Sequence, residues 1–276
     1  MAIDDSIAPA ACSSAVGVLL KRKETDDFVS GIIIQEKMEN NTYKKTAHGI
    51  VSDEQYSHLM DQLRIMLIPT ASHLDLLQKA VHKEIEDLSM IVQATIPQEN
   101  GTTKQVLATA DALDAMEIDK EKFLQDAISA SEQNYPAVIA PLSSCLGVDD
   151  GVGLPDGVGL PLYVASMAGM ENGAGVILYP HFMEKAAQEL GGGFYVLPSS
   201  VHEVLFLRDD GAISLEKLKG IVHSVNQTEV SDEDFLSDNV YHYDAMERKL
   251  EIGEKFQERK AHEKEGRPYY PHQEIR

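Results

Sequence analysis

The segment PSSVHEV, at residues 198–204, gathers the side chains most able to do chemistry. Ser199, Ser200, His202 and Glu203 bring hydroxyl, imidazole and carboxyl groups together within a few positions. These groups can serve as nucleophile, general base and general acid when a rigid sheet presents them on a loop. The segment is therefore the candidate site of a small hydrolase.

A zinc hydrolase of the HExxH type would pair two histidines one helical turn apart and use the glutamate to activate water. Here Val204, Leu205 and Phe206 follow Glu203, so the second histidine is missing. The segment also alternates like a strand, which would direct His202 and Glu203 to opposite faces. We expect no metal site and no cofactor.

A serine hydrolase would need a base within about 3 Å of Ser199 or Ser200, together with a pair of oxyanion donors. Neither GxSxG nor SxxK occurs in the chain. A Cys145–His202 pair would need a site that stabilises the thiolate, and the sequence around Cys145 shows no sign of one.

The alternative interpretation is structural. Ser199 and Ser200 would satisfy a hairpin turn through side-chain hydrogen bonds, and His202 would be a half-buried residue paired with a neighbour. Other polar or phenolic residues either converge on the same pocket or act in turns and caps: Asn172, Tyr179, Asp238, Tyr241 and Asp244.

The composition restricts the classes of function. The 276 residues carry 24 Lys and Arg against 45 Asp and Glu, a net charge of −21, so most of the surface repels nucleic acid. Only two cysteines occur, far apart, and they predict neither a disulfide framework nor a thiolate zinc site. Asp4 and Asp5 stand where a secretion signal would be basic, so we expect a cytoplasmic protein that does not enter a membrane.

Hydrophobic periodicity and turn signals predict an α+β fold, with a mixed, largely antiparallel sheet layered against amphipathic helices. The predicted strands are residues 29–37, 85–97, 104–108, 162–166, 173–179, 194–197 and 201–207. The predicted helices are residues 52–67, a segment after Ser72, 119–135, 180–190 and 214–225. The Asn100-Gly101 dipeptide predicts a hairpin between the strands 85–97 and 104–108.

Two segments differ from the rest of the chain. Residues 150–161 repeat DGVGLP in tandem, which indicates a duplicated surface loop rather than a phosphate cradle, because no GKS or GKT follows. From Glu247 onward, eight basic and seven acidic residues with few apolar anchors predict an exposed or partner-bound helix, in which Glu251 and Lys255 have helical spacing.

From about residue 67 to 250, the chain resembles domain-of-unknown-function family 5688 of anaerobic Gram-positive bacteria. The matching stretches include HKEIEDLSMIV, LYVAS, NGAGVILYP, LGGGFYVLPSSVHEVLFL and LSDNVYHYD. The resemblance implies an α+β protein with no assigned activity and no catalytic residues to transfer. It divides the chain into a poorly matched segment 1–66, a core domain 67–250 with an insertion at 150–161, and a charged helical tail 251–276.

Two functions remain open. The leading hypothesis is a non-enzymatic binding or regulatory protein, of the kind that mobile elements or phages encode, whose acidic surface contacts a protein partner. The alternative is a small hydrolase whose site gathers Ser199, Ser200, His202 and Glu203 with Tyr179 or Tyr241.

Overall fold

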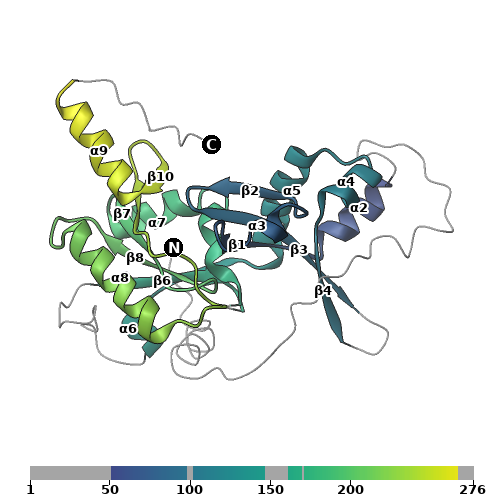
Figure 1. Cartoon of the computed structure of the whole chain (residues 1–276), viewed down its shortest axis with the longest axis horizontal. Coiled ribbons are helices and arrows are strands. Elements are labelled where there is room, and N and C mark those ends of the chain that lie inside the picture. Colours follow the sequence, from purple (N-terminus) through teal and green to yellow (C-terminus); the bar gives the residue numbers. More distant parts are fainter. Residues whose placement is uncertain (1–50, 98–101, 147–160, 170, 267–276) are drawn as a thin grey trace.

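Two antiparallel sheets organise the protein. The structure is a computed structural model, and it describes residues 51–97, 102–146, 161–169 and 171–266. The predicted strand 29–37, the turn at Asn100-Gly101 and the duplication at 150–161 lie outside the described residues. Figure 1 shows the smaller sheet with α2, α4 and α5 beside it, and the larger sheet with α7 and α8.

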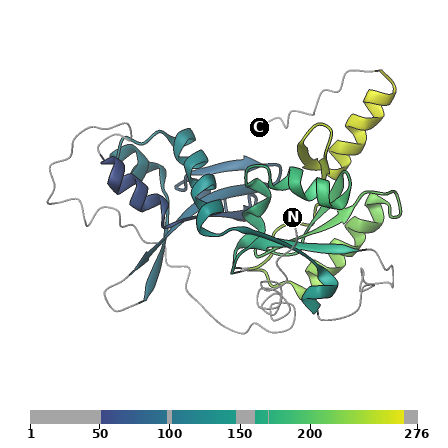
Figure 2. The ribbon, with the colours of Figure 1, turned by 180° about the vertical axis from the view of Figure 1, so that it is seen from behind.

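The smaller sheet has β3 at its centre, with β1 on one side and β2 and β4 on the other. Its strands are β1 (Leu63–Pro69), β2 (His82–Ile85), β3 (Leu88–Pro97) and β4 (Thr103–Leu107). The far end of β3 pairs with β4 beyond the end of β1, so this hairpin stands out from the body (Figure 1 and Figure 2).

The helices around this sheet are α2 (Asp53–Met60), α3 (Leu74–Leu77), α4 (Ala110–Ala115) and α5 (Lys120–Asn134). Ser52 and Gln55 form a capping box at the start of α2, and the Asp119 carboxylate accepts a hydrogen bond from the Lys122 amide at the start of α5. The cap at Asp119 and the end of α5 before Pro136 are as predicted.

The larger sheet has six strands in the order β10-β9-β7-β8-β6-β5, all antiparallel. They are β5 (Ala137–Pro141), β6 (Leu162–Met167), β7 (Phe194–Pro198), β8 (Val204–Arg208), β9 (Tyr241–Asp244) and β10 (Lys249–Ile252). The elements between them are α6 (Leu142–Leu146), the 3₁₀ helix η2 (Gly173–Leu178), α7 (Phe182–Leu190) and α8 (Leu215–Glu229). The α+β class and the antiparallel pairing confirm the prediction.

Alternation along the central strands gives the larger sheet two buried faces. On one face, Tyr195, Leu197 and Leu207 pack against Leu215, Leu218 and Val222 of α8. On the other face, Phe194 and Phe206 join a core that continues through α7 and η2 to the smaller sheet. One continuous core therefore holds both sheets.

Two predicted elements are wrong. The predicted helix 52–67 ends at Met60, and the residues from Leu63 form β1, because every residue of this strand except the half-buried Arg64 is apolar and buried. The predicted strand 173–179 is the 3₁₀ helix η2, in which Gly173 and Gly175 allow close packing against β6 and β1.

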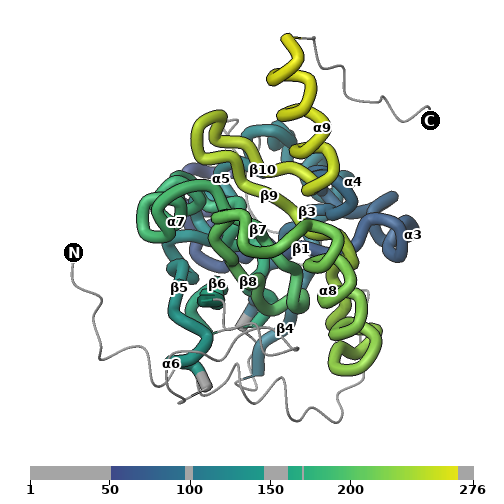
Figure 3. The backbone as a smooth tube through the Cα atoms, turned by 90° about the vertical axis from the view of Figure 1, so that its left-hand side faces the viewer, coloured from purple at the N-terminus to yellow at the C-terminus, as the bar shows by residue number. Residues whose placement is uncertain are grey.

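The charged tail begins with a strand rather than with a helix. Glu251 lies in β10, and the helix α9 (Gly253–Lys264) starts after it and projects from the body (Figure 3). Arg259 is 8% exposed and donates to Glu251 at 2.5 and 2.8 Å and to Asp244 at 3.0 Å. A buried ion cluster at Arg259, in the middle of α9, thus binds the helix to β9 and β10. The small number of apolar residues in this segment gave no indication of that contact.

Candidate functional site

The PSSVHEV segment is a tight turn between β7 and β8. The second strand starts at Val204 rather than at Val201, so His202 and Glu203 lie in the turn. The Ser200 amide donates to the Glu203 carbonyl oxygen at 3.2 Å, and the His202 amide donates to Ser200 Oγ at 3.0 Å. The Ser200 hydroxyl therefore stabilises the turn, as the alternative interpretation expects.

The main chain of this turn is bound to the beginning of η2 and to β6. The His202 carbonyl oxygen accepts hydrogen bonds from the Gly173 amide at 3.0 Å and from Ser166 Oγ at 2.7 Å. The Ala174 amide donates to the Val201 carbonyl oxygen at 3.2 Å. These contacts hold the turn against segments that are distant in sequence.

Both ring nitrogens of His202 are occupied. Nδ1 accepts a hydrogen bond from the Asn172 amide at 3.0 Å, and Nε2 lies 2.9 Å from Asp234 Oδ1. Because a backbone amide can only donate, Nδ1 is the acceptor and the neutral ring carries its proton on Nε2, which donates to Asp234. The imidazole has no nitrogen free to take a proton from Ser199 or Ser200.

Glu203 is the chemically unusual member of the turn. It is 5% exposed, and its Oε2 atom has no hydrogen-bond partner. Burial raises the pKa of the Glu203 carboxyl, whereas His202 and the hydroxyls of Ser199 and Ser200 act in the opposite direction. The site therefore favours the protonated acid more than a surface position does.

The two candidate tyrosines belong to other networks. The Tyr179 hydroxyl lies 2.9 Å from the carbonyl oxygens of Ser131 and Tyr135, and burial raises the pKa of Tyr179 to about 12. The Tyr241 hydroxyl donates to Asp87 at 2.5 Å, and burial together with the Asp87 charge raises its pKa. Tyr179 joins η2 to α5, and Tyr241 joins β9 to the β2–β3 turn.

The remaining candidate residues also make hydrogen bonds or ion pairs within the fold. Asp238 is exposed and accepts from Asn226 at 2.8 Å, with His223 at 3.0 Å. Burial alone would raise the pKa of Asp244, but hydrogen bonds from Lys260 and Arg259 outweigh burial and hold this pKa well below its ordinary value. Asn172 contributes its backbone amide to His202, from the left-handed conformation at φ 51°.

The Cys145–His202 pair is excluded by the state of the cysteine. Cys145 is disulfide-bonded rather than free. Cys145 therefore has no thiol to form a catalytic pair with His202.

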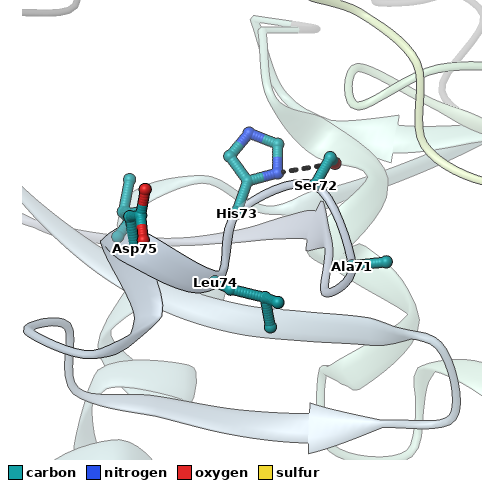
Figure 4. Close-up of a pocket in the computed structure, with 6 residues that line it drawn as sticks. Ala71, Ser72, His73, Leu74 and Asp75 are labelled. Atoms are coloured by element: carbon teal, nitrogen blue, oxygen red, sulfur yellow. Dashed lines mark hydrogen bonds between the residues drawn. The ribbon is translucent and has the colours of Figure 1, made fainter.

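A shallow depression lies elsewhere, along a single segment from Ala71 to Leu76 (Figure 4). Ser72 Oγ and His73 Nδ1 lie 3.1 Å apart there, and Leu74 is 59% exposed. No group of three or more His, Cys, Asp or Glu able to hold a metal ion occurs in the part of the chain that the structure describes. Across those same residues, no helix has the length and apolarity to cross a membrane.

Sequence reasoning missed Asp234 and Ser166. Asp234 lies 32 positions from His202 in an acidic run, and Ser166 lies inside a strand. Neither position carries a local signal, because the fold rather than the sequence spacing brings them to the turn.

The fold and this turn define an α+β protein in which the described candidate residues form separate structural networks. The chain belongs to the family of unknown function DUF5688, whose model matches residues 19–245. The match begins well before residue 67, so it includes part of the segment that the resemblance had left out. No curated protein and no solved structure matches the chain.

Proposed function

We propose that this protein acts by binding a protein partner through an acidic surface, and not by catalysis. The observation that carries the proposal is the occupied imidazole of His202, bound by Asn172 on one side and by Asp234 on the other. A general base needs a free nitrogen within reach of the nucleophile. The turn that looked most catalytic in sequence instead fixes an acidic segment in place.

This acidic segment comprises residues 229–238. Residues 220–247 contain seven Asp and Glu and no Lys or Arg. Within the segment, the exposed acids are Glu229, Asp232, Glu233 and Asp238. These exposed acids are close in sequence and give this part of the surface a negative charge.

Hydrogen bonds to Asp234 and Ser237 fix the acidic segment in its middle and near its end. The Val201 amide donates to the Asp234 carbonyl oxygen at 2.9 Å, and Ser237 Oγ donates to Asp87 at 2.7 Å. Asn226 of α8 donates to the Ser237 carbonyl oxygen at 3.0 Å. A surface held in this way loses little conformational entropy when a partner binds.

The chemistry of this surface selects a basic partner. Negative charges attract Lys and Arg side chains, increase the association rate and repel nucleic acid, and salt weakens each of these effects. We therefore expect a partner protein with a basic face, bound most tightly at low ionic strength.

The test is a pull-down with matched charge variants. The immobilised protein should retain a partner from a native lysate at low salt and release it as salt rises. Asp232→Lys/Glu233→Lys should abolish retention, whereas Asp53→Lys/Glu54→Lys, which makes the same charge change on exposed positions of α2, should preserve it. Recovery of no partner contradicts binding, and equal loss in both variants contradicts the location.

A small hydrolase is the second candidate, and one observation favours it. Glu203 is a buried acid with an unpartnered oxygen beside the hydroxyls of Ser199 and Ser200. A panel of activated esters should show turnover that Glu203→Gln removes if this turn is catalytic. We expect no turnover above the rate of the uncatalysed reaction.

A further inference from the structure

The His202 ring joins two segments that are far apart in the sequence. Its Nδ1 atom accepts from the Asn172 amide at the start of η2, and its Nε2 atom donates to Asp234 in the acidic segment. The ring is nearly buried, with 8% of its side chain exposed. Only the neutral Nε2–H tautomer can make both contacts, because the Asn172 amide needs an acceptor.

We propose that His202 is a pH-dependent latch that binds the backbone amide of Asn172, the N-cap residue of η2, when the ring is neutral and releases this amide when the ring is protonated. Protonation puts a second N–H on Nδ1, directly opposite the Asn172 N–H at 3.0 Å. Two donors facing each other at hydrogen-bond distance repel. The contact to Asp234 changes in the opposite sense, because a charged imidazolium bonds a carboxylate more strongly than a neutral ring does.

Asn172 is the residue on which the latch acts. Its backbone has φ 51°, in the left-handed region that asparagine enters more readily than most residues. When the Asn172 amide loses its acceptor, this less favourable backbone conformation loses one of its supports. The Gly173 and Ser166 hydrogen bonds to the His202 carbonyl oxygen do not depend on the ring, so the release is confined to the Asn172 side.

The charged groups around the ring set the balance between the two states. Asp234 contacts it directly, and Glu203 interacts with it electrostatically from within the turn. Both carboxylates favour the protonated ring, and the Asn172 amide favours the neutral one. Glu171 lies next to Asn172 and is exposed. On acidification, His202 therefore changes from a bridge between two segments to a group that holds the acidic segment alone.

The latch does not depend on the partner-binding proposal, and it is tested without a partner. Nuclear magnetic resonance should follow the Asn172 amide and the His202 ring nitrogens between about pH 8 and pH 5, the range in which imidazole groups in general change charge. We expect an Nε2–H ring at the upper pH. As the ring gains its proton, exchange of the Asn172 amide, corrected for its intrinsic pH dependence, should rise roughly five- to tenfold, the range expected for one lost hydrogen bond.

Two variants distinguish the effect of His202 protonation from a general effect of acid on the protein. His202→Gln keeps a donor and an acceptor but does not titrate here, so its Asn172 amide should show no pH-dependent change. His223→Gln, at a histidine whose side chain is 55% exposed and paired with Asp238, should behave as the wild type does. An Nδ1–H ring at pH 8, or an Asn172 amide that stays equally protected while the ring titrates, would overturn the proposal, and both readouts come from the wild-type protein.

Discussion

Gly173 shows how closely the turn, η2 and β6 approach one another. A Cβ atom at this position would lie 2.0 Å from Ser166 Oγ, 2.6 Å from the Met167 amide nitrogen and 2.7 Å from the His202 carbonyl oxygen. Two of these three atoms are backbone and cannot rotate away. The contacts that fix His202 therefore require a residue without a side chain at position 173.

Gly173→Ala should lower the free energy of unfolding by more than about 2 kcal/mol, because the added methyl group forces the backbone of two elements apart. Gly220→Ala is the matched control, since its Cβ would meet nothing within 4 Å and lies inside α8. That change should stabilise the protein by about 0.5–1 kcal/mol, the helix preference of alanine over glycine. Urea unfolding measures both, and equal effects would contradict the crowding at Gly173.

Arg259 is the second residue whose replacement has a clear expectation. Arg259→Ala removes the guanidinium group from Glu251, which is 1% exposed, and leaves this carboxylate with its ion pair to Lys249, so we expect a loss of about 3 kcal/mol, the lower end of the range for a broken buried pair. Lys264→Ala, at an exposed position of the same helix, should change stability by less than about 0.5 kcal/mol.

Since the pKa of Asp244 is held low, the Asp244 contribution to stability exists at neutral pH and is lost in acid. Wild type and variant should therefore converge in stability as the pH falls.

The residue types of the turn could be predicted from the sequence, but their partners could not. Ser200 behaves as a turn residue, which its position after a strand and a proline indicates. Whether His202 is a base or a bridge depends on Asn172 and Asp234, and both reach it only through the tertiary fold. A local pattern carries no information on a nitrogen's hydrogen-bond partner.

At the scale of elements, caps and turns were the reliable signals. Asp119 and Ser214, the first residues of the predicted helices 119–135 and 214–225, cap α5 and α8, because a cap depends on its own side chain and the next three residues. The segments from Leu63 and from Gly173 were assigned wrongly, since a continuous apolar run fits a strand or a buried helix equally well. Only the contacts of β1 with β3 and of η2 with β6 decide between them.

The β2–β3 turn joins the smaller sheet to the C-terminal third of the chain. Asp87 accepts from both Tyr241 and Ser237, and Lys255 donates to Glu86 at 2.6 Å. Tyr241→Phe and Asp87→Ala should each destabilise the protein, and their effects should be coupled by about 1–3 kcal/mol because the two groups share one hydrogen bond. A double-mutant cycle by urea unfolding measures this coupling, and additive effects would show that the contact contributes nothing specific.

At the scale of the molecule, the buried core is shared and not divided between the sheets. Met90 of β3 and Phe206 of β8 are both 0% exposed and belong to one cluster. That cluster passes through Ala174 and Val176 of η2, which lies between the sheets. Separation of the two sheets would therefore expose this shared cluster to water, although each sheet also has a smaller cluster of its own.

We therefore expect residues 51–266 to unfold in one cooperative transition. Met90→Ala and Phe206→Ala should each lower stability by about 2–5 kcal/mol, the range for large-to-small changes in a core, and both should move the same transition. Calorimetry combined with hydrogen exchange of each sheet checks this, with the exposed Met246→Ala as a control that should leave the transition in place. Two transitions, each moved by only one of the core variants, would show that the sheets are independent units and that the contacts of Asp87 and η2 are too weak to couple them.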